Sequence, residues 1–288
     1  MENSLGLDGL IIPPLARRGF MMTSLVSGLT LATARVEAQV ITTSSQGIVA
    51  GEVKVKVADG ELPGYFAKPE GAGPFPIVLV NEEIFGVHEY IRDVCRRFAK
   101  AGYAAIAVEI YARLADLSRV EMSDAGRIIR DVVPKALDAT MLSDSDAAIA
   151  YAASHGGDAG RVGVVGFCRG GRNTWLYAAH STTVKAAVAF YGPLRGETSA
   201  LQPQTAADIA TSINCPLLGL YGGKDSSIPV DDVQWVASDA KAAGRTVEIV
   251  IYPDAPHGFH ADYRPSYRRV AAEDGWARAL AWFRKYGV

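Results

Sequence analysis

Short, continuous runs of apolar residues recur along the chain, and they constrain its fold more than any other feature. Each run is bounded by Gly, Pro or charged residues and is typical of a strand buried on both faces. Patterns of helical periodicity lie between the runs. Regular alternation of this kind predicts an α/β fold, in which a mostly parallel sheet is covered by helices on both faces. The six runs are 77–80, 104–108, 162–165, 186–190, 217–221 and 247–251.

The helical patterns cover residues 89–101, 136–154, 171–179, 230–243 and 267–286, and several of them end at Gly. Residues 53–57 and 62–67 alternate around a turn at Asp59-Gly60, which predicts an antiparallel hairpin before the first run. We find no internal repeat or linker after this point. Residues 39–288 are therefore predicted to form a single α/β domain.

The composition excludes several classes of function. The 288 residues include 29 Lys and Arg against 31 Asp and Glu, and a net charge of −2 argues against a nucleic-acid partner. The apolar runs are too short to suggest stable membrane insertion. The three cysteines form neither a CxxC motif nor a Cys/His cluster, and no nucleotide-binding glycine motif is present. We therefore expect no metal and no other cofactor, while the oligomeric state stays undefined.

The first 38 residues have the layout of an export signal. Arg17-Arg18 precedes an uncharged stretch over 21–34, and Val36-Glu37-Ala38 provides small residues before a plausible cleavage site after Ala38. Paired arginines followed by Phe resemble a twin-arginine signal, which predicts a periplasmic or exported protein. The alternative is an amino-terminal arm that is retained on a cytoplasmic protein.

A cysteine lies at the centre of a Gly166-Phe167-Cys168-Arg169-Gly170 motif, between a predicted strand and a predicted helix. This is the context in which G-x-S-x-G forms a nucleophile elbow, a sharp turn that exposes the central side chain above the sheet. The start of the helix favours a thiolate at Cys168. Cys95 and Cys215 lie among apolar residues without such glycines, so we interpret them as buried core residues.

Two further residues complete a candidate triad. Cys168, Asp225 and His257 follow strand-like runs in the chain order nucleophile, acid, histidine. We expect Cys168 to attack, His257 to exchange a proton with the nucleophile or the leaving group, and Asp225 to orient the imidazole. Asp254 competes for the role of the acid, but it lies on the same loop as His257. The backbone N–H groups of Arg169 and Ile84 are the candidates for an oxyanion hole.

Together these segments resemble the dienelactone hydrolase family of α/β-hydrolases, whose members are also called carboxymethylenebutenolidases. The resemblance covers nearly the whole chain after Gly51. It is carried by the cysteine elbow and by the segments Glu83-Ile84-Phe85-Gly86, Tyr111-Ala112-Arg113, Gly223-Lys224-Asp225 and His257-Gly258-Phe259.

The resemblance implies additional site residues. Glu83 is expected to lie beside the nucleophile and to take the thiol proton when substrate binds, whereas Glu82 is interpreted as part of a solvated turn. Arg113 and Tyr111 are expected to line the substrate site, with Arg113 binding a substrate carboxylate. The family's second arginine is absent, because Ala261 stands four residues after the triad histidine. Its candidate replacements are His260, Arg169 and Arg264.

The expected function is a thiol-dependent hydrolase of small carboxylic esters or lactones that works through an acyl-thioester on Cys168. The alternative is a noncatalytic relative of the same fold, which binds a ligand or senses redox state through Cys168.

Overall fold

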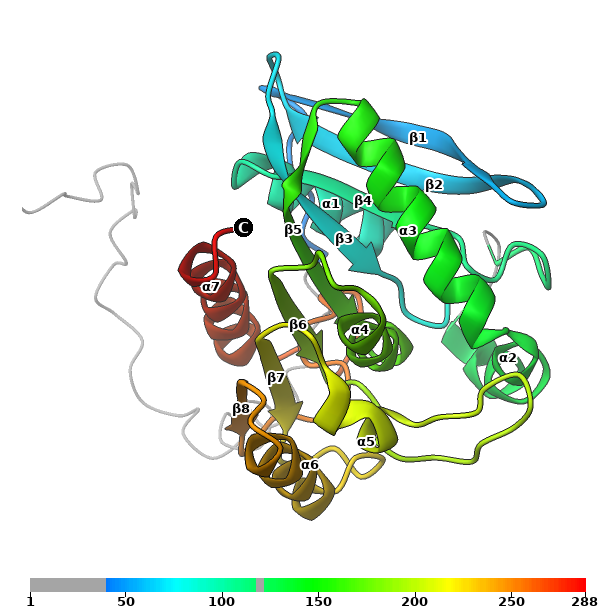
Figure 1. The fold of residues 1–288 in the computed structure, drawn as a ribbon, viewed down its shortest axis with the longest axis vertical. Helices are drawn as coiled ribbons and strands as arrows, with labels where there is room; N and C mark the ends of the chain where they lie inside the picture. The colour runs from blue at the N-terminus through cyan, green and yellow to red at the C-terminus, as the bar shows by residue number, and fades with distance from the viewer. Residues whose placement is uncertain (1–39, 118–121) are drawn as a thin grey trace, which may run out of the picture. The chain divides into compact units, whose positions relative to one another are not determined.

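The computed structural model describes residues 40–117 and 122–288, so the predicted signal segment 1–38 lies outside the described residues. An eight-stranded sheet with the order β1-β2-β4-β3-β5-β6-β7-β8 forms the centre of the fold (Figure 1). Its strands are β1 Ile48–Val57, β2 Gly60–Pro69, β3 Phe75–Asn81, β4 Ala104–Val108, β5 Gly157–Phe167, β6 Ala186–Phe190, β7 Leu217–Gly222 and β8 Val247–Tyr252.

The sheet is parallel from β4 to β8, and each of the six apolar runs forms one of these strands. The predicted hairpin is also present: β1 pairs with β2 in antiparallel register, and β2 continues the sheet by pairing antiparallel with β4. Strands β4 and β6 are buried along their whole length, because helices pack on both faces of the sheet. This burial explains why their sequences are continuously apolar. The predicted α/β-hydrolase fold is thus confirmed.

Helices cover both faces of the sheet. Figure 1 shows α3 and α4 in front of the strands and α1 behind them. On that second face the ring of Phe98 in α1 lies 4.5 Å from the ring of Trp276 in α7, so these two helices pack together. The helices are α1 Glu89–Lys100, α2 Ala125–Asp131, α3 Asp138–Ser154, α4 Arg169–His180, α5 Ala206–Ile209, α6 Val230–Ala242 and α7 Arg269–Lys285.

The structure adds two short helices that the sequence patterns do not predict. Helix α2 lies between 3₁₀ turns at Met122–Asp124 and Val133–Lys135, and it packs into a small apolar cluster with Phe85 and Tyr111. Helix α5 follows a long loop after β6 and begins with a capping box between Thr205 and Asp208. Both helices are too short to give a clear periodic pattern in the sequence.

Candidate active site

The parallel strands bring the predicted site residues to one edge of the sheet. The loops after β3, β5, β7 and β8 all leave the sheet at its carboxyl edge, where ligands bind in open α/β folds. Glu83, Cys168, Asp225 and His257 each follow one of these strands. Residues that lie up to 174 positions apart in the sequence (257 − 83) are therefore collected at the same edge.

Cys168 forms a strained elbow between β5 and α4. Its φ of 54° and ψ of −121° lie in a region that non-glycine residues rarely adopt, and such strain persists only where the surroundings enforce it. The glycines provide this enforcement. A Cβ on Gly166 would lie 2.0 Å from the carbonyl oxygen of Gly170, and a Cβ on Gly170 would lie 2.2 Å from the oxygen of Asn81. Helix α4 can therefore begin in direct contact with the end of β3.

The other two cysteines differ from Cys168 in exposure. Cys168 is half-buried, whereas Cys95 and Cys215 are buried in the core. Burial raises the thiol pKa of Cys95 well above its usual range and that of Cys215 to about 12. Neither buried thiol is suited to act as a nucleophile.

His257 and Asp225 form a hydrogen-bonded pair beside the elbow. The imidazole Nδ1 lies 2.7 Å from Asp225 Oδ2, while the backbone N–H and the hydroxyl of Ser227 donate to Oδ1 at 2.9 and 2.6 Å. Burial opposes protonation of His257, but its hydrogen bonds with Asp225 and Cys168 raise its pKa to about 10. Asp254 instead contacts Lys224 at the surface, so Asp225 is the carboxylate that orients the histidine.

The proposed oxyanion donors belong to segments that touch one another. Arg169 is the first residue of α4, and the first N–H groups of a helix have no acceptor within the helix. Ile84 is buried in the loop that follows β3. The close approach of Gly170 to the carbonyl oxygens of Asn81 and Glu82 brings the start of α4 against this loop. The first residues of α4 and the loop that carries Ile84 are therefore neighbours.

Glu83 is completely buried and is held by three side chains. Arg264 Nη2 lies 3.0 Å from Oε1, the Tyr263 hydroxyl donates to Oε2 at 2.6 Å, and His88 Nε2 lies 3.4 Å from Oε2. Burial alone would raise the pKa of Glu83, but the charge of Arg264 and the hydrogen bonds lower it to about 2. A carboxylate in this state is a poor proton acceptor, so the resting arrangement does not favour the expected proton transfer from Cys168.

Arg113 is placed differently from the expectation that it binds substrate. Its guanidinium donates to Asp59 with two bonds of 2.7 Å and to Asp144 with bonds of 2.7 and 3.0 Å. These two carboxylates compensate its charge and occupy its donors. Arg113 therefore ties the β1–β2 turn to α3, and the expectation of a carboxylate anchor at this position needs correction.

His260 also requires a correction, because it is buried beneath the site. Its side chain packs against the stacked rings of Phe167 and Phe190, and its Nδ1 lies 2.7 Å from the hydroxyl of Tyr90. Burial and the charge of Arg97 lower its pKa to about 3. A neutral, buried imidazole cannot replace a substrate-binding arginine.

Tyr111 and Glu82 are both buried, and Tyr111 packs in the same apolar cluster as Ile84. Burial raises the pKa of Tyr111, and the nearby charge of Arg169 opposes this shift. Glu82 accepts a 3.0 Å hydrogen bond from the Ile110 N–H, while its Oε2 is buried without a partner among the described residues. Burial and the proximity of Glu109 raise the pKa of Glu82 well above its usual value. The interpretation of Glu82 as a solvated residue is therefore wrong.

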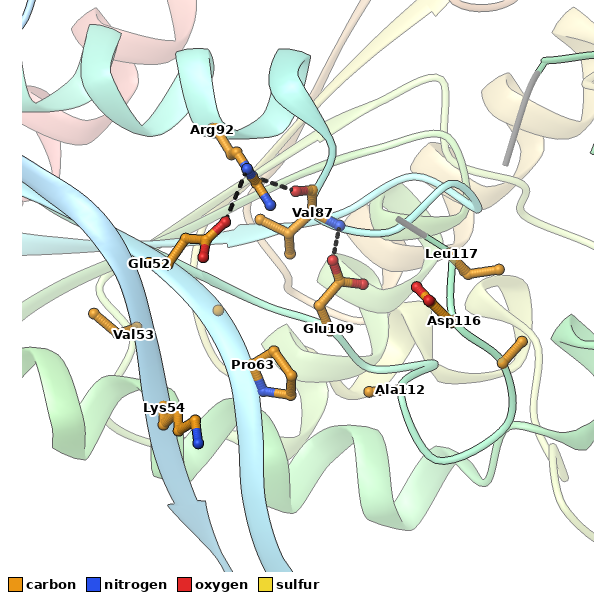
Figure 2. A pocket seen from close by; sticks show the side chains of 12 residues that line it. Glu52, Val53, Lys54, Pro63, Val87, Arg92, Glu109, Ala112, Asp116 and Leu117 are labelled. Carbon is orange, nitrogen blue, oxygen red and sulfur yellow. Dashed lines mark hydrogen bonds and ion pairs between the residues drawn. The ribbon is translucent and has the colours of Figure 1, made fainter. Parts of the chain in front are cut away.

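A cavity of about 520 Å³ lies beside the β1–β2 hairpin. Figure 2 shows the side chains that line it. Arg92 contacts Glu52 at 3.1 Å on one side, and Glu109 accepts a 2.9 Å bond from the Val87 N–H on the other. None of the three triad candidates lines this cavity. Glu109 nevertheless accepts this bond from the loop that carries Ile84, and so ties that loop to the end of β4.

Within residues 40–117 and 122–288, no group of His, Cys, Asp and Glu side chains has an arrangement that could hold a metal ion. No helix in the same residues has the length and apolar character needed to cross a membrane.

A nucleophile elbow between a central parallel strand and a helix, on a sheet of this order, defines an α/β-hydrolase fold. The chain belongs to the dienelactone hydrolase family, whose family model matches residues 62–287. Sequence similarity to known proteins supports this assignment over nearly the whole chain. A protein of Methylorubrum extorquens described as "Putative carboxymethylenebutenolidase" is 52% identical over 276 residues, which cover 95% of this chain and 94% of the relative.

Two other comparisons extend the family relationship. A protein of a Bradyrhizobium species described as "Probable 2-oxo-3-(5-oxofuran-2-ylidene)propanoate lactonase" is 32% identical over 224 residues, covering 76% of this chain and 88% of the relative. The crystal structure of a "Putative Dienelactone Hydrolase" from Klebsiella pneumoniae is 51% identical and matches with a TM-score of 0.80, covering 83% of this chain and 99% of that one. The protein is a hydrolase of this family and resembles carboxymethylenebutenolidases.

Proposed function

We propose that the protein hydrolyses small carboxylic esters or lactones through a thioester on Cys168, without a cofactor. The observation that carries this proposal is the position of His257, whose Nδ1 lies 2.7 Å from Asp225 and whose imidazole pKa is raised by Asp225 and Cys168. A ligand-binding or redox-sensing relative would need the thiol but no oriented proton carrier. The noncatalytic alternative is therefore not favoured.

The proposed reaction begins with attack of the Cys168 thiolate on the substrate carbonyl carbon. The thiol proton rests on His257, whose raised pKa of about 10 keeps the imidazole protonated at neutral pH. The tetrahedral oxyanion is stabilised by the N–H groups of Ile84 and Arg169. Its collapse breaks the bond to the alkoxide oxygen, which takes the proton from His257. Neutral His257 then removes a proton from water as the water oxygen attacks the carbonyl carbon of the thioester. Collapse of this second tetrahedral intermediate breaks the C–S bond, which releases the acid and regenerates the thiolate.

Asp225 stabilises the imidazolium through both steps. Asp225 is buried, and its own pKa is lowered by the hydrogen bond with His257 despite the opposing effect of burial. The two Ser227 donors fix the carboxylate in place. His257 therefore keeps one orientation while it exchanges its proton on the nitrogen opposite Asp225.

The names of the relatives support a proposal for the substrate class. The relatives include proteins described as a carboxymethylenebutenolidase and as a lactonase that acts on a propanoate, and both names denote lactones that carry a carboxylate. We propose substrates of this size and chemistry for the present protein.

We expect Asp225→Asn to lower kcat for a small ester by about 10²- to 10⁴-fold, because the imidazolium loses its negative partner. Initial rates with 4-nitrophenyl acetate and with a small lactone such as dihydrocoumarin measure the effect. Asp254→Asn is the matched control, since Asp254 is exposed and contacts only Lys224 among the described residues. Equal rates in the wild type and Asp225→Asn would contradict the proposed role of the pair.

A further inference from the structure

Two carboxyl groups join the loop after β3 to the loop after β4. Glu82, at the start of the first loop, accepts a 3.0 Å hydrogen bond from the N–H of Ile110 in the second loop. Glu109, at the start of the second loop, accepts a 2.9 Å bond from the N–H of Val87 in the first loop. Each loop thus supplies a carboxyl group to a backbone donor of the other. We call these two bonds the carboxyl clamp, which fixes both ends of residues 82–87.

The far end of this segment fits closely around Glu109. Gly86 has a φ of 75°, and a Cβ there would lie 2.5 Å from Oε2 of Glu109, so the turn requires a glycine. The Nε of Arg92 donates to the carbonyl oxygen of Val87 at 2.8 Å, which fixes the other side of that residue. Glu109 is itself held by β2, because its backbone N–H donates to the carbonyl oxygen of Pro63 at 2.8 Å.

The near end of the segment lies against the nucleophile elbow. A Cβ on Gly170 would lie 2.5 Å from the carbonyl oxygen of Glu82, so the backbone of Glu82 contacts the first turn of α4. The side chain of Glu82 is buried and reaches Ile110 instead. Ile84, whose N–H is the proposed oxyanion donor, lies between the two clamped ends. A displacement of either end would therefore move this N–H relative to Cys168.

The clamp works through accepting oxygens rather than through ion pairs at Glu82. Among the described residues Glu82 has no cationic partner, and its Oε2 has no hydrogen bond. Burial and the charge of Glu109 raise the pKa of Glu82 well above its usual value, which favours the neutral acid. The proton can then reside on Oε2 while Oε1 accepts from Ile110. Burial also raises the pKa of Glu109, but the bond from Val87 and the charge of Arg92 oppose this shift.

We propose that Glu82 and Glu109 are positioning residues that hold the Ile84 N–H in the geometry of an oxyanion donor. This proposal rests on the proposed function and adds two residues that act on the reaction through the backbone of 82–87. A donor stabilises the oxyanion only where its N–H points at the developing charge, and a displacement of about 1 Å can cost about 10²-fold in rate. The accepting oxygens of the two side chains are essential for this role, whereas their negative charges are not.

The test removes the accepting oxygen and the charge separately. Glu109→Gln keeps an oxygen for Val87, whereas Glu109→Leu removes it in a side chain that lines the 520 Å³ cavity and therefore has space. We expect Glu109→Leu and Glu82→Leu to lower kcat for 4-nitrophenyl acetate by about 10- to 100-fold, with a smaller change in KM. Glu109→Gln and Glu82→Gln should restore most of the rate. Glu61→Leu is the matched control, since Glu61 is exposed on β2 and pairs with Lys54.

A second measurement separates the oxyanion donor from the reactivity of the thiol. Acylation of Cys168 by 4-nitrophenyl acetate forms an oxyanion, whereas alkylation by iodoacetamide forms none. Glu109→Leu should therefore slow acylation by about 10- to 100-fold and leave the alkylation rate unchanged. If the wild type hydrolyses the ester through Cys168 and Glu109→Leu is acylated equally fast, the role of the clamp is overturned and the hydrolase proposal stands. The same conclusion follows if Glu109→Gln is as slow as Glu109→Leu.

Amide hydrogen exchange provides a readout that needs no substrate. Glu109→Leu should raise the exchange rate of the Val87 N–H by at least about tenfold, because this donor loses its acceptor, while Glu109→Gln should not. Unchanged exchange in Glu109→Leu would overturn the clamp whatever the activity. If the wild type cleaves no ester while the exchange rate still depends on the accepting oxygen, the hydrolase proposal fails and the clamp stands as the structural support of residues 82–87.

Discussion

Cys168→Ala is expected to lower kcat/KM for small esters by at least about 10³-fold while the protein remains folded. The substitution removes the sulfur that forms the thioester and retains the Cβ, so the backbone of the elbow experiences the same steric demands. Steady-state hydrolysis measures the loss, and circular dichroism together with thermal unfolding reports the fold.

Cys215→Ala is the matched control for this substitution. Cys215 is a buried thiol that precedes β7, and its side chain belongs to the hydrophobic core. The folded fraction of this variant should hydrolyse esters at the wild-type rate. Undiminished hydrolysis by Cys168→Ala would show that the sulfur is not the nucleophile.

Arg264→Met is expected to destabilise the protein by about 3–5 kcal/mol at neutral pH, because it leaves Glu83 as an uncompensated buried charge. The side chain of Glu83 has no exposed surface, and that of Arg264 is 13% exposed. Urea unfolding measures the change in the free energy of unfolding. The double variant Glu83→Gln/Arg264→Met should be more stable than Arg264→Met alone, because its buried amide carries no charge.

The pH dependence of these variants separates charge from packing. The folded-state pKa of Glu83 is lowered to about 2 from an ordinary value of 4.5, so its ionisation stabilises the wild type above pH 4.5 and this contribution is lost as the pH falls toward 2. Without Arg264 the pKa should rise instead. The destabilisation caused by Arg264→Met should then be largest at neutral pH and smaller at about pH 4. If Arg264→Met lowers the free energy of unfolding by the same amount at every pH, the cause is lost packing and not an unpaired carboxylate.

The fold could be predicted from sequence because its signals are local. A strand buried on both faces must be apolar along its whole length, and this requirement makes runs such as 186–190 recognisable without any tertiary information. The sequence signal of the elbow is equally local. The turn at Cys168 needs residues without a Cβ at Gly166 and Gly170, and both lie within two residues of Cys168. Helices α2 and α5 escaped prediction because they are short and depend on contacts outside their own segments.

The partners of the charged residues could not be predicted, because they come from distant parts of the chain. Arg113 lies 54 residues from Asp59 and 31 residues from Asp144, and no local pattern indicates that these three meet. Glu82 and Glu83 form an acidic pair that is typical of a solvated turn, yet the loop after β4 and Arg264 enclose them. The family resemblance could indicate a role for Arg113, but only the contacts of this chain show that its donors are occupied.

The central claim is that a covalent acyl-thioester forms on Cys168 during hydrolysis. The most direct measurement is intact mass spectrometry of the protein quenched in acid within the first turnovers of an activated ester, followed by peptide mapping. The account predicts a mass increase equal to one acyl group, located on the peptide that contains Cys168 and absent from Cys168→Ala. Rapid hydrolysis by the wild type without any acylated Cys168, under conditions in which acylation outpaces deacylation, would contradict it.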